Sequence, residues 1–116
     1  MTRWFHHATG LLLVAAVFLT AVSTSAQTTT GGIRGTVTDP SGAAIAGAKV
    51  VATNLGTQLT LTASTDVSGT YAFTLLPVGT YSVTVESTGF KRFEQTNVPL
   101  TTNQVLGLNV TLEVGA

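Results

Sequence analysis

Residues 66–90 read DVSGTYAFTLLPVGTYSVTVESTGF and contain the phrase Gly-Thr-Tyr twice, ten residues apart. Each copy follows a cluster of turn-forming residues and opens a run in which apolar and polar residues alternate, which is the period of a half-buried strand. Each strand therefore starts from a tight turn whose last residue is a glycine, Gly69 or Gly79. Tyr71 and Tyr81 are predicted to be the first large inward-facing residues of two neighbouring strands.

The same alternation extends outward from this stretch over most of the chain. Together with a less regular segment at residues 90–100, it predicts seven short strands, and no helical period follows residue 30. In residues 90–100, Phe90, Phe93 and Val98 do not share one parity, so a bulge or an edge strand is expected there. The pattern predicts an all-β chain, an antiparallel sandwich or small barrel. The residues predicted to face inward include Ile33, Val37, Ala48, Val50, Ala52, Leu59, Leu61, Ala63, Tyr71, Phe73, Leu75, Tyr81, Val83, Val85, Leu106, Leu108, Val110 and Leu112.

The first 26 residues differ from the rest and match a secretory signal peptide in all three of its regions. Arg3 gives a positive start, residues 11–22 are apolar apart from Thr20, and residues 23–26 (STSA) are small. Cleavage is predicted between Ala26 and Gln27. The rival interpretation is an uncleaved membrane helix, but a span needs about 20 apolar residues, and this run has twelve. Residues 27–31 are predicted to be a flexible polar lead-in and residues 32–114 a single domain.

Composition excludes several kinds of chemistry. The chain has no cysteine, which excludes disulfides and thiolate sites. Without residues 1–26 it also has no His and no Trp, and its four basic and five acidic residues give a net charge of 4 − 5 = −1. This balance gives no electrostatic case for nucleic acid or for an anionic membrane surface. Contact with a membrane is expected only through the signal peptide before cleavage, and no cofactor is expected.

GTVTDPSGAAIAGAKVVATN (residues 35–54) and TDVSGTYAFTLLPVGTYSVTVESTGF (residues 65–90) together resemble the carboxypeptidase regulatory-like domains. The resemblance covers nearly all of residues 31–114 and is specific in order and spacing. The positions that carry it are Gly35, Val37, Asp39, Gly42, Gly47, Ala48, Val50, Thr65, Asp66, Gly69, Tyr71, Phe73, Leu76, Gly79, Tyr81, Val83, Gly89 and Phe90.

This resemblance implies a transthyretin-like, seven-stranded β-sandwich without catalytic activity. In metallocarboxypeptidases such a domain follows the catalytic one. In many exported Gram-negative proteins it forms the N-terminus of TonB-dependent outer-membrane receptors, and a signal peptide followed at once by this domain looks like the start of such a receptor. The sequence ends at Ala116 without a plug or barrel, which leaves a free-standing module, a truncated reading frame and a fragment as alternatives.

Candidate catalytic and metal sites each have a simpler interpretation. Asp39 and Asp66 offer carboxylates for calcium, but each is the first residue of an Asp-x-Ser-Gly turn, where Asp caps its own backbone. Transthyretin-like hydrolases of ureides look to be built on His and Arg, and the processed chain has no His to act as a base. Lys49, Glu86 and Asn109 supply the residue types of an isopeptide cross-link, but all three should point outward, whereas that reaction needs them buried together.

Three further surface features concern binding. Lys91, Arg92 and Phe93 form the candidate ligand or partner surface, because Phe93 is the one ring outside the regular inward rows that is flanked by charges. Asn109-Val110-Thr111 fits the N-glycosylation pattern but lies within a strand, which favours a chance match. Residues 90–100, or the strand ending at Val114, offer an edge for another chain's strand, although Lys91, Arg92 and Pro99 are typical protective residues.

These observations predict an exported, non-enzymatic structural or interaction module located in the periplasm, at the outer membrane or outside the cell. The predicted partners are proteins, either cell-envelope proteins or domains of a receptor. The alternative is a small extracellular carbohydrate-binding module, since related sandwiches bind starch through exposed rings. No nucleic acid is expected as a partner.

Overall fold

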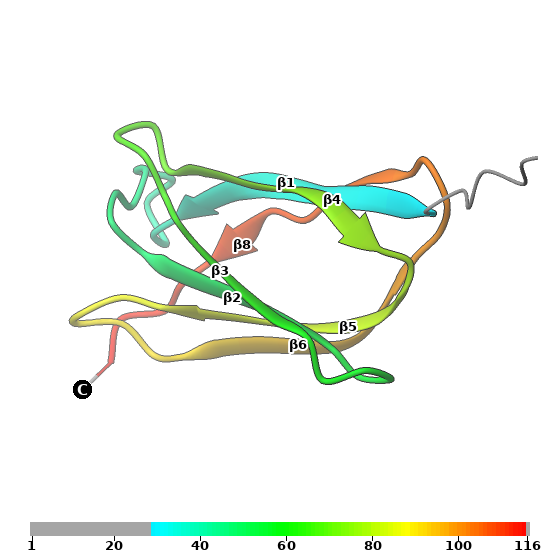
Figure 1. Cartoon of the computed structure of the whole chain (residues 1–116). Helices are drawn as coiled ribbons and strands as arrows, with labels where there is room; N and C mark the ends of the chain where they lie inside the picture. Colours follow the sequence, from blue (N-terminus) through cyan, green and yellow to red (C-terminus); the bar gives the residue numbers. More distant parts are fainter. Residues whose placement is uncertain (1–28, 116) are drawn as a thin grey trace, which may run out of the picture.

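The computed structural model describes residues 29–115, which form two sheets packed face to face (Figure 1). One sheet has the order β4-β1-β7, with β8 also paired to β1, and the other has the order β3-β2-β5-β6. The predicted all-β sandwich is thereby confirmed. The strands are β1 (Thr30–Thr38), β2 (Lys49–Asn54), β3 (Thr60–Ser64), β4 (Thr70–Pro77), β5 (Gly79–Glu86), β6 (Phe93–Leu100), β7 (Val105–Gly107) and β8 (Val110–Thr111).

β7 and β8 follow one another along β1 and together form one interrupted strand, which brings the total to the predicted seven. Their pairing with β1 is parallel, whereas the other strand pairs are antiparallel. The cause is that β6 ends at the end of the sandwich where β1 begins, so the loop after β6 crosses to the other sheet and the chain enters that sheet beside the start of β1. Gln104 accepts a hydrogen bond from the Gly32 amide at 2.8 Å there, and the Asn103 amide donates to Thr30 at 2.8 Å.

The core lies between the sheets and consists mainly of the predicted inward rows. Tyr81, Val83 and Val85 on β5 are fully buried, as are Val50 and Ala52 on β2. Buried polar side chains are few and satisfied. The Thr65 hydroxyl, for example, donates to the Ile45 carbonyl at 2.6 Å and accepts from the Ala48 amide at 2.8 Å. Within residues 29–115, no buried side-chain nitrogen or oxygen lacks a hydrogen-bond partner.

The inward prediction for Leu75 on β4 is wrong for a local reason. Leu75 is 78% exposed and its neighbour Leu76 is fully buried. The register with β1 shifts there, because Gly31 pairs with Leu76 and Ile33 with Phe73, so two residues of β4 face one of β1. This bulge reverses the parity of the strand, and Leu75 takes a left-handed φ of 54°.

The inward row on β3 is oriented as predicted but is not buried. Leu61 pairs with the buried Ala52 and so faces the same side of its sheet. Leu59 and Leu61 are nevertheless 40% and 36% exposed, because β3 is the outer strand of its sheet. In Figure 1, β3 crosses the near side of the sandwich with no strand in front of it.

β6 confirms the expectation of a bulge or an edge strand after residue 90. It pairs with β5 alone, and its register shifts between Tyr81 and Val83 of that strand. Phe90 and Phe93 are partly buried against the core.

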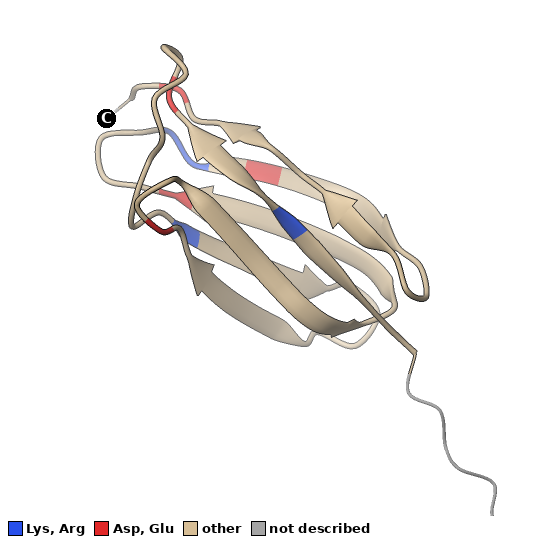
Figure 2. Ribbon diagram, turned by 90° about the horizontal axis from the view of Figure 1, so that it is seen from above, with Lys and Arg blue, Asp and Glu red and all other residues tan. Residues whose placement is uncertain are grey.

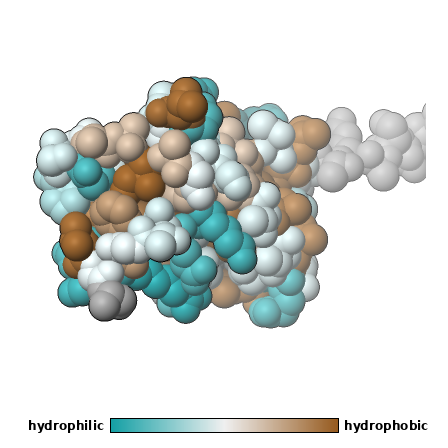
Figure 3. Space-filling view, turned by 90° about the vertical axis from the view of Figure 1, so that its left-hand side faces the viewer, coloured by the Kyte–Doolittle hydropathy of each residue, from teal (hydrophilic) through white to brown (hydrophobic). Residues whose placement is uncertain are grey.

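The ends of the sandwich differ in what they carry. The turns after Asp39 and Asp66 lie at one end with the C-terminus, and β1 begins at the other (Figure 1). Figure 3 shows the first end, where hydrophilic and hydrophobic residues are interspersed. Of the predicted lead-in at residues 27–31, Thr30 and Gly31 belong to β1. The predicted signal peptide and its cleavage site at Ala26 and Gln27 lie outside the described residues.

Candidate functional site

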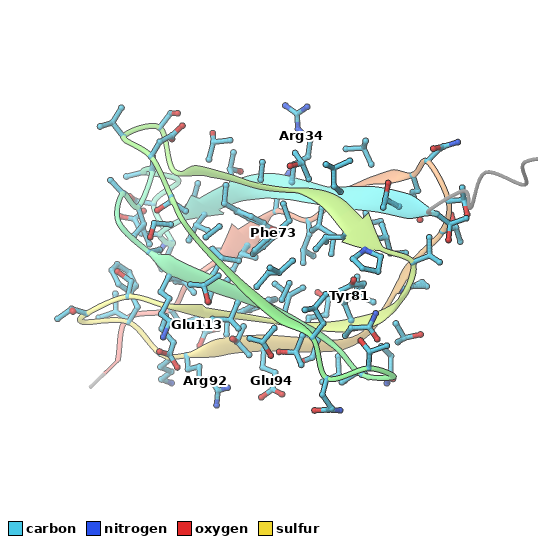
Figure 4. The ribbon with its side chains drawn as sticks, in the orientation of Figure 1. Arg34, Phe73, Tyr81, Arg92, Glu94 and Glu113 are labelled. Atoms are coloured by element: carbon cyan, nitrogen blue, oxygen red, sulfur yellow. The ribbon has the colours of Figure 1, made fainter. Side chains whose placement is uncertain are left out.

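The outer face of the β4-β1-β7 sheet carries Arg34, and its neighbours on the two adjacent strands are small. Arg34 pairs with Ala72 of β4 on one side and with Gly107 of β7 on the other. Figure 4 shows Arg34 pointing away from the interior on this side, whereas Phe73 and Tyr81 lie between the sheets. Because these two neighbours have no long side chains, the whole Arg34 side chain, including its guanidinium, is accessible.

A groove of about 340 Å³ runs beside Arg34 on this face. Its rims include two large apolar side chains, Leu75 at 78% exposure and Val105 at 65%. The left-handed backbone of Leu75 costs roughly 1–3 kcal/mol for a residue other than glycine. It places a leucine in solvent where regular alternation would have buried it. The lining residues are Thr30, Gly31, Gly32, Arg34, Thr70, Ala72, Phe73, Thr74, Leu75, Asn103, Gln104 and Val105.

Arg34 forms no side-chain hydrogen bond or ion pair with any residue of the described part of the chain. The two ion pairs found there join Lys91 to Glu113 at 3.9 Å and Arg92 to Glu86 at 3.3 Å. Charged positions are sparse along the strands (Figure 2). The groove thus combines an apolar rim with one uncompensated positive charge, an arrangement suited to a carboxylate carried on an apolar group. The sequence shows Arg34 only as an outward residue, and its isolation depends on the sheet order.

The predicted surface of Lys91, Arg92 and Phe93 does come together. These residues line a hollow of about 390 Å³ with Glu94 and residues 111–113. The two cations are engaged by Glu113 and Glu86, and Phe93 is half-buried against the core instead of standing free as a ring. Its role as a ligand or partner surface stays a prediction.

The aspartate turns have the predicted backbone-capping geometry. Asp39 Oδ1 accepts hydrogen bonds from the Ser41 hydroxyl at 2.6 Å and from the Ser41 and Ala43 amides at 2.9 and 3.0 Å. Asp66 Oδ1 repeats the set, accepting from the Ser68 hydroxyl at 2.7 Å and from the Ser68 and Thr70 amides, both at 2.9 Å.

These bonds have an electrostatic consequence. The Ser41 hydroxyl, followed by the Ala43 amide, lowers the pKa of Asp39. The Thr70 amide, followed by the Ser68 hydroxyl, lowers the pKa of Asp66. Both carboxylates are thereby committed to their own turns, and residues 29–115 contain no group of three or more His, Cys, Asp or Glu placed to hold a metal ion.

The three residues considered for an isopeptide bond are all exposed, as predicted. Lys49 and Glu86 are register partners on β2 and β5. Asn109 lies in the other sheet, where its Oδ1 accepts hydrogen bonds from the amide and the hydroxyl of Thr36 at 3.1 and 3.3 Å. The geometry does not bring the three together.

Asn109 belongs to a junction that sequence reasoning missed. Between β7 and β8 the chain leaves the ladder, and the Asn109 side chain takes the place of a backbone acceptor for Thr36. The displaced Leu108 carbonyl accepts the Tyr71 hydroxyl at 2.5 Å. A Cβ on Gly35 would overlap that carbonyl, so this glycine is needed for the close approach. Burial raises the pKa of Tyr71 to about 12.

The part of the chain that the structure describes contains no helix long and apolar enough to cross a membrane.

The fold is that of a small β-sandwich domain with a groove on the outer face of one sheet. The model of the carboxypeptidase regulatory-like domain matches residues 32–113. The chain belongs to this family, as its turns and paired Gly-Thr-Tyr phrases predict. No curated protein matches the chain.

Solved structures share the fold at low sequence identity. The Bacillus anthracis TIE protein is 19% identical with a TM-score of 0.64, over 74% of this chain and 17% of that one. A Bacteroides uniformis protein provisionally described as carbohydrate-binding is 19% identical with a TM-score of 0.59, over 72% and 41%. Acinetobacter radioresistens catechol 1,2-dioxygenase is 18% identical with a TM-score of 0.62, over 78% and 53%. The chain spans about half or less of each structure, and the likeness concerns the fold alone.

Proposed function

We propose that this chain is a non-catalytic, exported interaction module of the cell envelope that binds a protein partner through the Arg34 groove. The observation that carries the proposal is the groove itself, where Arg34 lacks an anionic partner within residues 29–115 and stands between the exposed Leu75 and Val105. Exposed apolar side chains around a cation are the composition of interface hot spots, in which arginine is enriched.

The partner that fits the groove presents a carboxylate flanked by aliphatic side chains. The carboxylate would pair with the Arg34 guanidinium, which offers two parallel N–H donors. The aliphatic groups would cover Leu75 and Val105 and exclude water from the ion pair. An exposed ion pair alone contributes only about 0–1 kcal/mol, so the apolar rim has to supply most of the affinity.

The non-catalytic part of the proposal rests on how the ionisable groups are used. Asp39 and Asp66 cap turns, and Glu86 and Glu113 pair with cations. The predicted processed chain has no His to serve as a base near neutral pH.

The cellular setting that we propose is the N-terminal extension of a TonB-dependent outer-membrane receptor. Its supports are the family of the domain and the predicted leader directly before it. The chain enters the sandwich at one end and leaves it at the other, which also suits a spacer between other domains (Figure 1).

A carbohydrate-binding role is the second candidate, supported by the likeness to the Bacteroides uniformis protein. Sugar platforms generally use exposed aromatic rings, whereas Tyr71, Phe73 and Tyr81 are buried here and Phe90 and Phe93 are half-buried. A screen of the exported chain against a glycan array tests this role, and binding there that Arg34→Gln does not alter would favour it over a protein partner.

Site-specific photocrosslinking tests the protein-binding proposal. The full chain is expressed in the organism that encodes it with p-benzoylphenylalanine in place of Val105, in the groove, or of Glu94, on the other sheet. We expect an envelope-protein adduct from position 105, none from position 94, and a several-fold loss of the adduct with Arg34→Gln. An adduct that forms equally at both positions, or that ignores Arg34→Gln, contradicts the proposal.

A further inference from the structure

The four outer edges of the two sheets differ in how well they are protected against pairing with another chain. β6 carries Glu94, the left-handed Asn97 and Pro99. β4 is interrupted by the bulge at Leu75 and ends at Pro77. β7 and β8 are only three and two residues long. Charges, prolines, bulges and shortness are the usual means by which an edge strand avoids addition of a further strand.

β3 has none of these protections. Its sequence, Thr-Leu-Thr-Ala-Ser, contains no charge, proline or glycine. It keeps a regular register with β2 over all five residues, from Thr60 opposite Thr53 to Ser64 opposite Lys49. Leu61, in the strand, is 36% exposed, and Leu59, directly before the strand, is 40% exposed.

The hydrogen bonds at the two ends of β3 show which backbone groups face outward. The Asn54 amide donates to Leu59 at 2.8 Å and the Thr65 amide donates to Ala48 at 3.0 Å. In an antiparallel ladder, hydrogen-bonded pairs alternate with non-bonded pairs. Leu61 and Ala63 therefore bond to β2, and the amides and carbonyls of Thr60, Thr62 and Ser64 point to the free edge.

We infer that a second copy of this chain pairs with this edge, antiparallel, about a two-fold axis through Thr62. Thr62 then faces Thr62 of the second copy, and Thr60 faces Ser64 in both directions. Each of these three pairs exchanges two backbone bonds, about six in all. The two sheets become one continuous sheet across the dimer.

The second copy fits this edge because the strand is self-complementary. An isologous interface places residue i of one copy opposite residue j of the other, and j opposite i. A charged strand would therefore be brought against an identical charged strand, and β3 carries no charge. Leu61 falls opposite Ala63 of the second copy on the core-facing side, where the pairing covers apolar surface that is exposed in the single chain. Paired Thr side chains are also favourable across strands.

Assembly through β3 stops at two copies, because each copy uses its single β3 edge in the contact. The dimer's remaining outer edge in this sheet is β6, which Glu94 and Pro99 protect, so the contact yields a dimer and not a fibre. A five-residue strand is small beside the roughly 800 Å² per partner of a standard interface. The dimer is therefore expected to be weak and to depend on concentration.

Sedimentation equilibrium tests the inference on residues 27–116, which contain every strand and every core residue of the described fold. The wild-type mass should rise toward twice the monomer value as concentration increases. Thr62→Pro removes an amide that faces the edge and leaves the ladder to β2 intact, so it should hold the mass at the monomer value. Thr62→Val keeps the amide and is the matched control, which should dimerise.

Two further measurements make the result decisive. If Thr62→Pro disturbs the fold, as far-UV circular dichroism would show, Thr62→Lys replaces it, because two lysines facing one another across the axis repel. A wild-type mass that stays monomeric at all concentrations overturns the inference. So does a dimer that survives both variants. The groove on the other sheet does not touch this edge, so Thr62→Lys should leave the Val105 crosslink unchanged.

Discussion

Tyr71 and Tyr81, the tyrosines of the two Gly-Thr-Tyr phrases, place their rings in the core and donate their hydroxyls to backbone carbonyls. Tyr81 reaches back four residues to Pro77 at 2.5 Å, at the end of β4. Tyr71 reaches across the sheet to Leu108 at 2.5 Å, in the gap between β7 and β8. Each bond satisfies a backbone carbonyl at a point where the chain leaves regular strand pairing. The two Gly-Thr-Tyr phrases therefore supply the same kind of hydrogen bond at two places in the sandwich. The strands that begin with these tyrosines, β4 and β5, lie in opposite sheets.

Replacing Tyr71 by Phe should lower stability in a way that depends on pH. At pH 7 the loss of the hydrogen bond leaves the Leu108 carbonyl without its hydroxyl partner, and we expect a decrease of about 1–3 kcal/mol in the free energy of unfolding. The folded-state pKa of Tyr71, about 12, lies above the ordinary value of 10.0. The stabilisation is therefore complete below pH 10 and is lost as the pH rises toward 12.

Urea denaturation of both proteins between pH 7 and pH 11 checks this expectation. The difference in unfolding free energy should be constant up to pH 9 and should shrink above pH 10, since the unfolded tyrosine then releases its proton and the folded one retains it. A difference that grows with pH contradicts the assignment of the raised pKa to Tyr71.

Residue-level prediction succeeds where alternation is regular and fails where the backbone departs from it. Tyr81, Val83 and Val85 follow the simple pattern and are all buried. Leu75 and Leu76 are chemically identical, so the pattern alone cannot show which of them a bulge will turn outward. Arg34 is visible as an outward cation, but its lack of an acidic neighbour depends on which strands flank β1.

Among the elements, the two Asp-x-Ser-Gly turns use the same hydrogen bonds in different surroundings. The amides of Gly42 and Gly69 donate to the carbonyls of Asp39 and Asp66 at 3.0 and 2.9 Å. Both glycines have left-handed φ values, 87° and 74°. A Cβ on Gly42 would meet nothing within 4 Å, whereas one on Gly69 would lie 2.6 Å from the Val37 carbonyl. The turn after Asp66 is packed against β1 and the turn after Asp39 is open.

The matched substitutions Gly42→Ala and Gly69→Ala should therefore differ. Gly42→Ala carries only the left-handed backbone strain, about 1–2 kcal/mol. Gly69→Ala adds an overlap with backbone that cannot move aside, which is worth roughly a further 1–3 kcal/mol. Thermal and urea unfolding of the two variants measure this difference. Equal destabilisation would show that the Val37 contact is not tight in solution.

Strand partners were harder to predict than strands. The turn chemistry marks where strands start, but the inward row of β3 is exposed because β3 is the outer strand of its sheet, which the alternation does not show. Similarly, alternation cannot distinguish a parallel from an antiparallel neighbour, and the interruption between β7 and β8 depends on the Asn109 side chain reaching Thr36. These features depend on contacts between residues distant in sequence, which local periodicity does not encode.

At the scale of the whole molecule, the first and last strands run parallel and the chain enters and leaves at opposite ends of the sandwich (Figure 1). A force applied to the two ends therefore pulls β1 along β7 and β8 in opposite directions. In this geometry the hydrogen bonds between the strands are sheared together instead of being opened one after another. Such a module should resist extension between whatever its two ends are joined to.

Single-molecule force spectroscopy can compare this shearing geometry with an unzipping one in the same domain. Attachment at Thr30 and Val114 loads the parallel strands in shear, whereas attachment at Thr30 and Pro77, which are register partners at the end of the β1–β4 ladder, opens that ladder pair by pair. Forced unfolding is governed by the unfolding rate along the pulled direction, so the first geometry should require the higher force at the same loading rate.

Asn109→Ala removes a side-chain acceptor through which the final strand holds β1. It should lower the force in the shearing geometry and leave the unzipping force almost unchanged, and an equal reduction in both geometries would locate the mechanical resistance outside the parallel strands.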